Sequence, residues 1–264
     1  MSFAYEGGQT ALDSVSLKVK AGERLAVLGS NGSGKSTLLK LLDGLYFATA
    51  GEVRAFGTPL TEEVFQDEPF NFAFRRRVGL VFQDTDVQLF SPSVWDEIAF
   101  APLQMEMARE EVESRVDTAL AALRIEKLRD RAPHRLSGGE KRRVALASVL
   151  SLSPDVWLMD EPTTGLDPRS QAWLVDFIIE QGRTGKSVIT ATHDLGIVEL
   201  IADRVCVFDE GHHLVAEGSP KEILSDEALL LTCNLIHEHR HVHEAEIAEH
   251  MHHHIHVVPH EHGH

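Results

Sequence analysis

Cysteine and long apolar runs are both scarce in this sequence of 264 residues. Its two cysteines, Cys206 and Cys233, are too few for a disulfide framework and indicate a reducing compartment. No apolar run approaches the ~18 residues that span a bilayer, and residues 1–10 lack the basic start and apolar core of a signal peptide. We therefore expect a soluble chain, for which any role at a membrane depends on a partner.

Basic residues are also in deficit. The chain has 25 Lys and Arg against 41 Asp and Glu, a formal net charge of −16. The last 30 residues hold five Glu and one Arg (net −4), which leaves −12 for the part before Leu235. Nonspecific binding of nucleic acid needs a basic surface that neutralises phosphates, so this balance argues against it. The hydrophobic content of 43% is ordinary for a globular protein.

The most specific local pattern is a glycine-rich loop between an apolar run and leucines at helical spacing. Residues 25–28 (LAVL) predict a buried strand, and residues 29–36 fit G-x-x-x-x-G-K-[ST]. The glycines let the backbone turn tightly, so that several N–H groups point at phosphate oxygens. Lys35 would reach the β- and γ-phosphates, and the Ser36 hydroxyl would bind Mg²⁺. The predicted ATP-binding residues of this loop are Gly29, Ser30, Asn31, Gly32, Ser33, Gly34, Lys35, Ser36 and Thr37.

A second signal is an apolar run that ends in two acids, at residues 156–161 (VWLMDE). Runs that are apolar throughout suit strands covered on both faces, as in parallel sheets, where ligands bind beyond the carboxyl ends of the strands. Asp160 is then placed to hold Mg²⁺ through water, and Glu161 to polarise the attacking water. Taken alone the two acids could be solvated loop charges, but the phosphate-binding loop favours the catalytic interpretation.

Residues 136–140 (LSGGE) resemble the signature motif of ABC-type ATPases. The resemblance covers roughly residues 1–230, with every motif of the family in order. Two departures from the family pattern are slight: Ser30 stands where proline is frequent, and Glu140 where glutamine is common.

The resemblance also implies roles for residues that no local pattern would single out. Tyr5 would stack on adenine, Gln83 of the Q-loop would sense the metal and the water, and His193 would be the switch histidine at the γ-phosphate. The implied catalytic residues are therefore Glu161, His193, Lys35 and Gln83, and the Mg²⁺ ligands Ser36, Gln83 and Asp160.

The signature motif itself predicts a second anion site, because a hydroxyl and small residues precede a run of helix formers at residues 140–150. An ordinary helix cap is the alternative. One pocket does not need two phosphate-binding helix ends, and the resemblance implies a head-to-tail dimer with two ATP molecules at the interface. The residues that would contact ATP across this interface are Ser137, Gly138, Gly139, Glu140 and Asp167 of the D-loop.

The resemblance implies an α/β fold. A P-loop (RecA-like) parallel-sheet core would carry the phosphate loop. An antiparallel β subdomain, near residues 1–25 and 51–82, would support the adenine. An α-helical subdomain, at about 84–155, would present the signature motif. We expect residues 1–234 to form the nucleotide-binding domain and residues 235–264 a separate, mobile histidine-rich tail.

The amino-acid sequence after Gln83 indicates which kind of transporter the ATPase serves. Residues 88–92 (QLFSP) resemble those of the ATPases of energy-coupling-factor importers of the cobalt/nickel type. With Val94 and Trp95 they favour an apolar groove for a partner's helix, although such a segment could also pack internally. The implied partners are a second ATPase copy, identical or paralogous, and integral membrane coupling and substrate-binding proteins. The implied location is the cytoplasmic face of the membrane.

The tail holds twelve of the sixteen histidines. Their spacing is strand-like in its first part (237–243) and helix-like at i,i+4 in two later pairs (250/254 and 252/256), and either can place two imidazoles on one face. Imidazole suits Co²⁺, Ni²⁺, Zn²⁺ and Cu²⁺. A solvated extension with incidental affinity is the alternative to a metal buffer or sensor. The candidate ligands are His237, His239, His241, His243, His250, His252, His253, His254 and His256.

The sequence thus predicts an ATP- and Mg²⁺-dependent subunit of a cobalt or nickel importer, and the Q-loop wording favours cobalt. An importer of zinc, of a vitamin or of an amino acid is the first alternative. An ABC ATPase that acts on DNA or ribosomes is more remote, because the chain has neither a coiled-coil insertion nor two ATPase units. A metal-storage protein with an incidental ATPase domain is the third.

Overall fold

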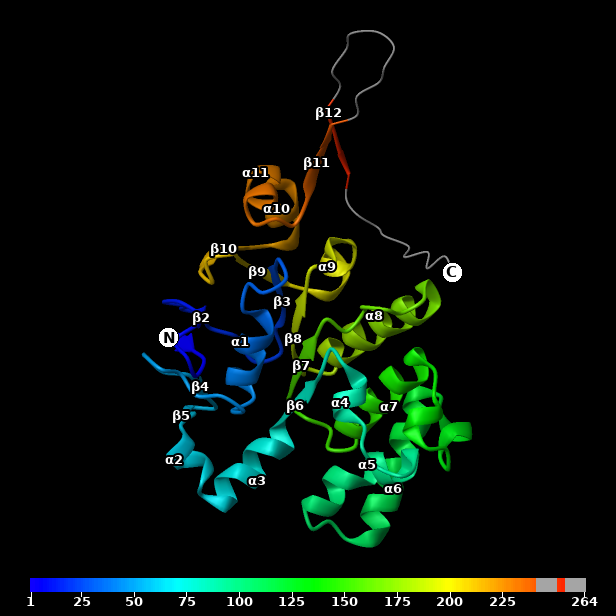
Figure 1. Ribbon diagram of the computed structural model, residues 1–264. Helices are drawn as coiled ribbons and strands as arrows, with labels where there is room; N and C mark the ends of the chain where they lie inside the picture. Colours follow the sequence, from blue (N-terminus) through cyan, green and yellow to red (C-terminus); the bar gives the residue numbers. More distant parts are fainter. Residues whose placement is uncertain (241–250, 255–264) are drawn as a thin grey trace.

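The structure, a computed structural model, describes residues 1–240 and 251–254. At its centre lies a six-stranded sheet with the strand order β10-β9-β3-β8-β7-β6 (Figure 1). The strands from β9 to β6 run parallel, and the edge strand β10 runs antiparallel to β9. The predicted parallel-sheet core is therefore confirmed. In chain order its strands are β3 (Arg24–Gly29), β6 (Val78–Val81), β7 (Val156–Asp160), β8 (Ser187–Thr192), β9 (Arg204–Phe208) and β10 (Leu214–Gly218).

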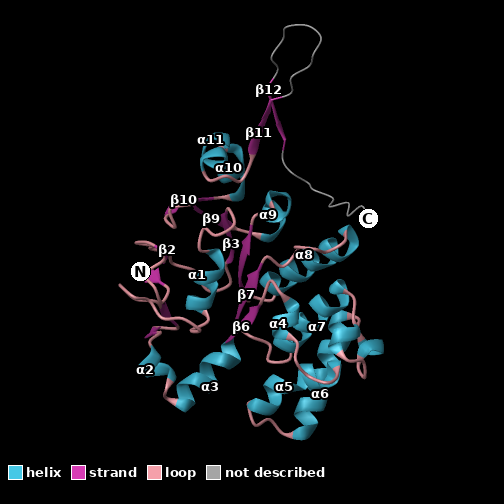
Figure 2. Cartoon of the chain, viewed as in Figure 1, coloured by secondary structure: helices cyan, strands magenta, loops and turns pink. Residues whose placement is uncertain are grey.

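Both faces of this sheet are covered by helices (Figure 2). Along β3, residues 25–28 are apolar throughout and alternate between two separate hydrophobic cores, because successive side chains of a strand point to opposite faces. One core contains α1 (Lys35–Leu42), which directly follows β3. The other contains α8 (Pro168–Arg183) and α9 (Leu195–Ile201). The continuous apolar runs of the sequence thus reflect burial on both sides.

Helices predominate between β6 and β7. They pack against the core that also contains α8, and their buried side chains, such as Ile98, Val116 and Leu146, belong to the same cluster. Ser93 caps the helix at Val94–Gln104 by accepting a hydrogen bond from the Asp96 N–H. The helices are α4 (Thr85–Gln88), α5 (Val94–Gln104), α6 (Arg109–Leu123) and α7 (Gly138–Leu150), with short 3₁₀ turns at Glu126–Leu128 and Pro133–Arg135.

Separate antiparallel ladders are present, but they are smaller than expected. The strands pair as β1 (Phe3–Ala4) with β2 (Thr10–Leu12) and as β4 (Arg54–Ala55) with β5 (Thr58–Pro59). The range of 51–82 given to the antiparallel subdomain is wrong in its second half.

Two helices and a strand of the main sheet occupy that second half. The helices are α2 (Glu62–Phe65) and α3 (Glu68–Arg77), and β6 joins the parallel core. The physical reason is capping, since the side chains of Thr61 and Asp67 accept hydrogen bonds from the first turns of these helices. Pro69 in the first turn adds to this, because its fixed φ suits that position.

The chain beyond β10 forms α10 (Pro220–Ser225), α11 (Glu227–Thr232) and an antiparallel pair, β11 (His237–Arg240) and β12 (Met251–His254). Residues 237–240 and 251–254 of the tail thus form a paired ribbon, and the mobility expected for the tail stays a prediction. His252, His253 and His254 lie in a strand, so the helical spacing does not describe them. His241, His243, His250 and His256 lie outside the described residues.

Hydrogen bonds from Arg75 join the end of α1 to α3. The guanidinium of Arg75 donates hydrogen bonds to the backbone carbonyl of Asp43 at 2.7 Å and to its carboxylate at 3.0 Å. Asp43 is buried, with 6% of its surface exposed. Burial raises the pKa of Asp43 to about 7, although Arg75 acts in the opposite direction. The native protein therefore holds a proton on this carboxyl over a pH range in which the unfolded chain has lost it.

This carboxyl is expected to make stability fall as pH rises. An unfolded Asp ionises near pH 4, so the native state binds more protons up to about pH 7 and the stability contribution is lost across that window. Urea unfolding at pH 6 and pH 8 should show that wild type loses about 1.4 kcal/mol relative to Asp43→Asn. Asp155→Asn is the control. Asp155 is exposed, and hydrogen bonding to Arg77 lowers the pKa of its carboxyl, so this group does not titrate between pH 6 and pH 8. Parallel pH profiles for wild type and Asp43→Asn would contradict the assignment.

Candidate functional site: a nucleotide-binding centre

The glycine-rich loop connects β3 directly to α1, and its backbone has conformations that only glycine adopts easily. Gly32 and Gly34 have φ values of 84° and 106°. A Cβ on Gly34 would lie 2.2 Å from the carbonyl oxygen of Ala11 on β2. The small N-terminal ladder therefore packs against the loop, and no larger residue fits at position 34.

Lys35 lies at the centre of this loop and is almost completely buried. Its ammonium donates hydrogen bonds to the carbonyl oxygens of Gly29 at 2.8 Å and Ser30 at 3.0 Å, and it lies 3.5 Å from a carboxylate oxygen of Glu161. Burial lowers the pKa of Lys35, and the charge of Glu161 acts against this. The lysine is thus a partly desolvated cation whose partners are backbone oxygens and one acid.

Besides a carboxylate oxygen of Glu161, three side-chain oxygens of this site are buried without a hydrogen-bond partner. They belong to Ser30, Ser33 and Asp160. Burying a polar atom without a partner costs about 1–3 kcal/mol, so such atoms usually mark a place where a ligand completes the bonding. Burial raises the pKa of Asp160, and the hydroxyl of Ser36 acts in the opposite direction. A hydroxyl and a carboxylate together suit a hard cation, so these residues fit Mg²⁺ and a phosphate chain.

Glu161 follows the end of β7 in a strained conformation. Its φ of 42° is uncommon for a residue with a side chain. Its N–H is bonded to the carbonyl of Ala191 on β8, which fixes this geometry. Such strain costs on the order of 1–3 kcal/mol and tends to occur at functional sites. The sheet thus holds the Glu161 carboxylate beside the phosphate loop.

His193 follows the end of β8, the strand that lies between β3 and β7. Its Nδ1 is 2.9 Å from a carboxylate oxygen of Glu161, and its side chain is half exposed. The hydrogen bond to Glu161 raises the pKa of His193. Lys35, Glu161 and His193, predicted from separate motifs, therefore meet at the carboxyl ends of three adjacent strands.

Tyr5 also reaches this site, from β1 and the loop after it. Its hydroxyl is 2.7 Å from the Thr37 hydroxyl on α1. Its ring makes edge contacts with Phe3 and Tyr46, at centroid distances of 5.2 and 5.8 Å. This aromatic group beside the phosphate loop suits a flat base, and Phe3 and Tyr46 were not identified from the sequence.

Gln83 is exposed, and its side chain has no described bond to the residues around Lys35. Its backbone is held instead by Arg142 of α7, whose guanidinium donates to the carbonyls of Phe82 and Gln83, both at 2.7 Å. Arg142 is buried, with 4% of its surface exposed. Sequence reasoning missed it, because in the run KRRV nothing distinguishes Arg142 from the neighbouring Lys141 and Arg143, which are only partly buried.

The signature residues lie at the start of α7. Ser137 caps the helix and forms a reciprocal capping box with Glu140. Asp167 caps α8 without a reciprocal bond, accepting from the N–H groups of Arg169 and Ser170. Within residues 1–236 no described hydrogen bond or ion pair joins residues 137–140 to the phosphate loop. The signature site is thus a separate, exposed helix start in this chain.

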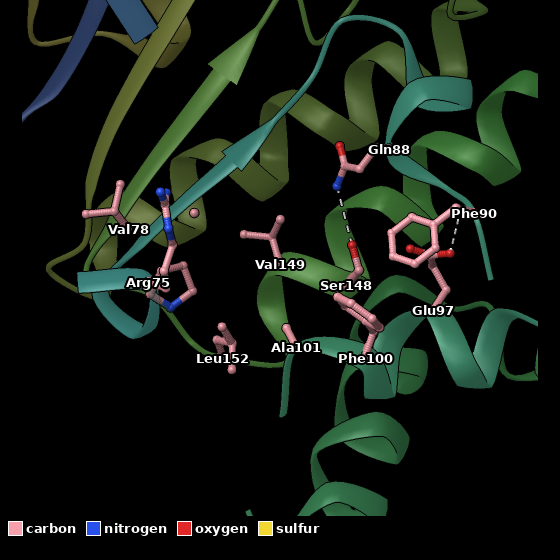
Figure 3. Close-up of a pocket in the computed structure, with 12 residues that line it drawn as sticks. Arg75, Val78, Gln88, Phe90, Glu97, Phe100, Ala101, Ser148, Val149 and Leu152 are labelled. Atoms are coloured by element: carbon pink, nitrogen blue, oxygen red, sulfur yellow. Dashed lines mark hydrogen bonds between the residues drawn. The ribbon is translucent and has the colours of Figure 1, made fainter. Parts of the chain in front are cut away.

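A groove lies between the edge strand β6 and helices α5 and α7 (Figure 3). Its volume is about 190 Å³. Phe90 and Phe100 form its apolar end, with ring centroids 4.9 Å apart, and both are exposed. Glu97 accepts hydrogen bonds from the N–H groups of Phe90 and Ser91, which orders the segment QLFSP.

The fold and the site together define a P-loop nucleoside triphosphatase of the parallel-sheet class. A family model described as ABC transporter matches residues 12–164, more than half of the chain. The chain therefore belongs to the ABC transporter family of ATP-binding proteins and is an ABC-type ATPase. In the part that the structure describes, no helix is both long and apolar enough to traverse a membrane.

Similar proteins include ATP-binding proteins of a nickel importer and of an energy-coupling factor transporter. The nickel import ATP-binding protein NikO of Rhodobacter capsulatus is 51% identical over 239 residues, covering 89% of this chain and 93% of that protein. The energy-coupling factor transporter ATP-binding protein EcfA of Methanothermobacter thermautotrophicus is 42% identical, covering 89% and 74%. The solved structure of cbiO1 from Clostridium perfringens, part of the complex cbiONQ, has a TM-score of 0.74 and 36% identity, with 89% and 92% covered.

Proposed function

We propose that this ATPase powers a membrane importer of a transition-metal ion, cobalt or nickel. The observation that carries the proposal is the 51% identity with a nickel import ATP-binding protein over nearly the whole length of both chains. The likeness to cbiO1 supports it, and so does the QLFSP segment at residues 88–92, which resembles cobalt/nickel importers. The segment at residues 88–92 favours cobalt as the transported ion, whereas the identity with the nickel import protein favours nickel.

In the proposed reaction the protein contributes mainly position and charge. Lys35 exchanges its contacts with the Gly29 and Ser30 carbonyls for the β- and γ-phosphates. Glu161 orients and polarises the attacking water, and His193 contacts the γ-phosphate. Mg²⁺, held by Ser36, Asp160 and Gln83, would supply further neutralisation of the phosphate charge.

We infer that two such chains act together. ABC ATPase cassettes act as dimers with membrane components. The signature helix start, at residues 137–140, is exposed and has no described bond to the phosphate loop of its own chain, which supports a role at the loop of a second copy. Asp167, Ser137, Gly138, Gly139 and Glu140 are the residues proposed to meet ATP across that interface. The second copy is either identical or a paralogue.

The groove beside Phe90 and Phe100 is the proposed docking site for a membrane partner. Exposed aromatic side chains beside a hollow suit an amphipathic helix. The partners would be integral membrane coupling and substrate-binding proteins, which would hold this chain at the cytoplasmic face of the membrane. Copurification from membranes tests this: the wild type should bring down small membrane proteins, and Phe90→Asp should release them. Recovery of the chain from membranes without partners would contradict it.

The histidine-rich tail is proposed as an accessory that binds transition metal, outside the transport route. A chain that ends at Ile236 should keep ATPase activity within about twofold, because the nucleotide site lies in the preceding residues. A chain that ends at Asn234 should be less stable by about 2–4 kcal/mol, since Leu235 and Ile236 pack on the core. Activity assays and urea unfolding measure both. Loss of ATPase activity in the Ile236 chain would show that the tail is more than an accessory.

A further inference from the structure

The histidine-rich ribbon is attached firmly to the folded part of the chain. Ile236 is 8% exposed and packs in the main core, and the next residue begins β11. The ribbon extends away from the sheet, beyond α10 and α11 (Figure 1). It therefore starts at a fixed place on the protein.

The register of this ribbon pairs histidine with histidine. His237 lies opposite His254, and His239 lies opposite His252. The other two pairs of the ladder do not match histidine with histidine. Glu238 lies opposite His253, and Arg240 lies opposite Met251. The histidines at i and i+2 on one strand thus stand at register positions opposite those at i and i+2 on the other.

This register places four histidines on one face of the ribbon. Residues that alternate along a strand share a face, and residues directly opposite each other on an antiparallel pair also share it. The spacing is roughly 5 Å across the pair and roughly 7 Å along each strand. The other face has an acid, an arginine, a methionine and a single histidine. His237, His239, His252 and His254 are called the four-histidine face below.

We propose that the four-histidine face is a binding site for one divalent transition-metal ion. Imidazole nitrogen suits Ni²⁺, Co²⁺, Zn²⁺ and Cu²⁺, whereas Mg²⁺ and Ca²⁺ need oxygen ligands, which this face lacks. Within residues 1–236, whose side chains the structure describes, no cluster of three His, Cys, Asp or Glu could hold a metal ion. The face deepens the proposed role in metal import, and specifies which histidines of the tail are needed.

The test is a calorimetric titration of the full-length, nucleotide-free protein with Ni²⁺ at pH 7.5. The face variant replaces His237, His239, His252 and His254 with alanine. The control variant removes the same number of histidines, His253, His260, His262 and His264. We expect the face variant to bind Ni²⁺ at least about tenfold more weakly, and the control to stay within about twofold of wild type. Binding should also weaken at pH 5.5, because protonated imidazole is not a ligand.

Equal losses in both variants would overturn the proposal, since binding would then depend only on how many histidines the tail carries. Unchanged binding in the face variant would overturn it as well. Unchanged ATPase activity and urea unfolding in both variants show that the ATPase is folded. The titration does not involve transport, so its result stands even if the import proposal fails. Mg²⁺ in place of Ni²⁺ should give no heat from binding at the four-histidine face.

Discussion

Replacing Glu161 with glutamine is expected to reduce ATP turnover by about 10²–10⁴-fold while ATP binding is kept. Glutamine keeps the shape of the side chain and can still occupy the strained position beside Ala191. It cannot act as a base for the attacking water, and it is a poorer acceptor for Lys35 and His193. Steady-state ATPase assays and nucleotide-binding titrations measure the two effects separately.

The matched control for this substitution is Glu63→Gln, on the exposed first turn of α2. It should keep turnover within about twofold, as surface substitutions usually do. Loss of ATP binding in Glu161→Gln would mean that the carboxylate holds the site together, and the assignment of Glu161 to the attacking water would then be wrong.

Replacing Lys35 with methionine is expected to weaken ATP binding by roughly 10- to 150-fold, the loss of one hydrogen-bonded charge. Methionine has similar length and fills the buried space, so the loop should keep its shape. The substitution leaves Glu161 without its buried cationic partner, which adds electrostatic repulsion toward the phosphates. Titration with a nonhydrolysable ATP analogue measures the affinity directly.

Lys40→Met on the same helix is the control for the lysine substitution. Its ammonium lies 5.5 Å from the centre of the Tyr46 ring, away from the backbone oxygens that hold Lys35. ATP affinity should change by less than about threefold. Equal losses at the two positions would show that the effect arises from net charge and not from the phosphate loop.

The sequence predicted which residues come together at the site because most of them lie in short local patterns. The loop from Gly29 to Ser36 needs its glycines for backbone reasons, and the apolar run before Asp160 needs a strand buried on both faces. Each pattern identifies its element by itself. Knowledge of parallel sheets then places the acids near the loop, as the contacts among Lys35, Glu161 and His193 show.

Other parts of the site depend on contacts between distant segments, which no local pattern encodes. Arg142 holds the Q-loop from α7, and nothing in KRRV indicates which arginine turns inward. Tyr46 joins Tyr5 across 41 positions of the chain because the segment after α1 pairs with Ser2, next to β1. The helices at residues 62–77, in contrast, could have been predicted from local patterns. Thr61 and the sequence Asp67-Glu68-Pro69 are typical starts of helices, but the expected β subdomain was preferred over these signals.

Uptake of Co²⁺ and Ni²⁺ by cells or vesicles that contain the complete transporter is the most direct test of the account. Wild type and Glu161→Gln would be compared at equal amounts of protein in the membrane, with radioactive or mass-spectrometric detection of the metal. The account predicts uptake of at least one of the two ions in wild type, and background uptake in Glu161→Gln. Uptake that is indifferent to Glu161, or a wild type that takes up neither ion, would contradict the import of these metals.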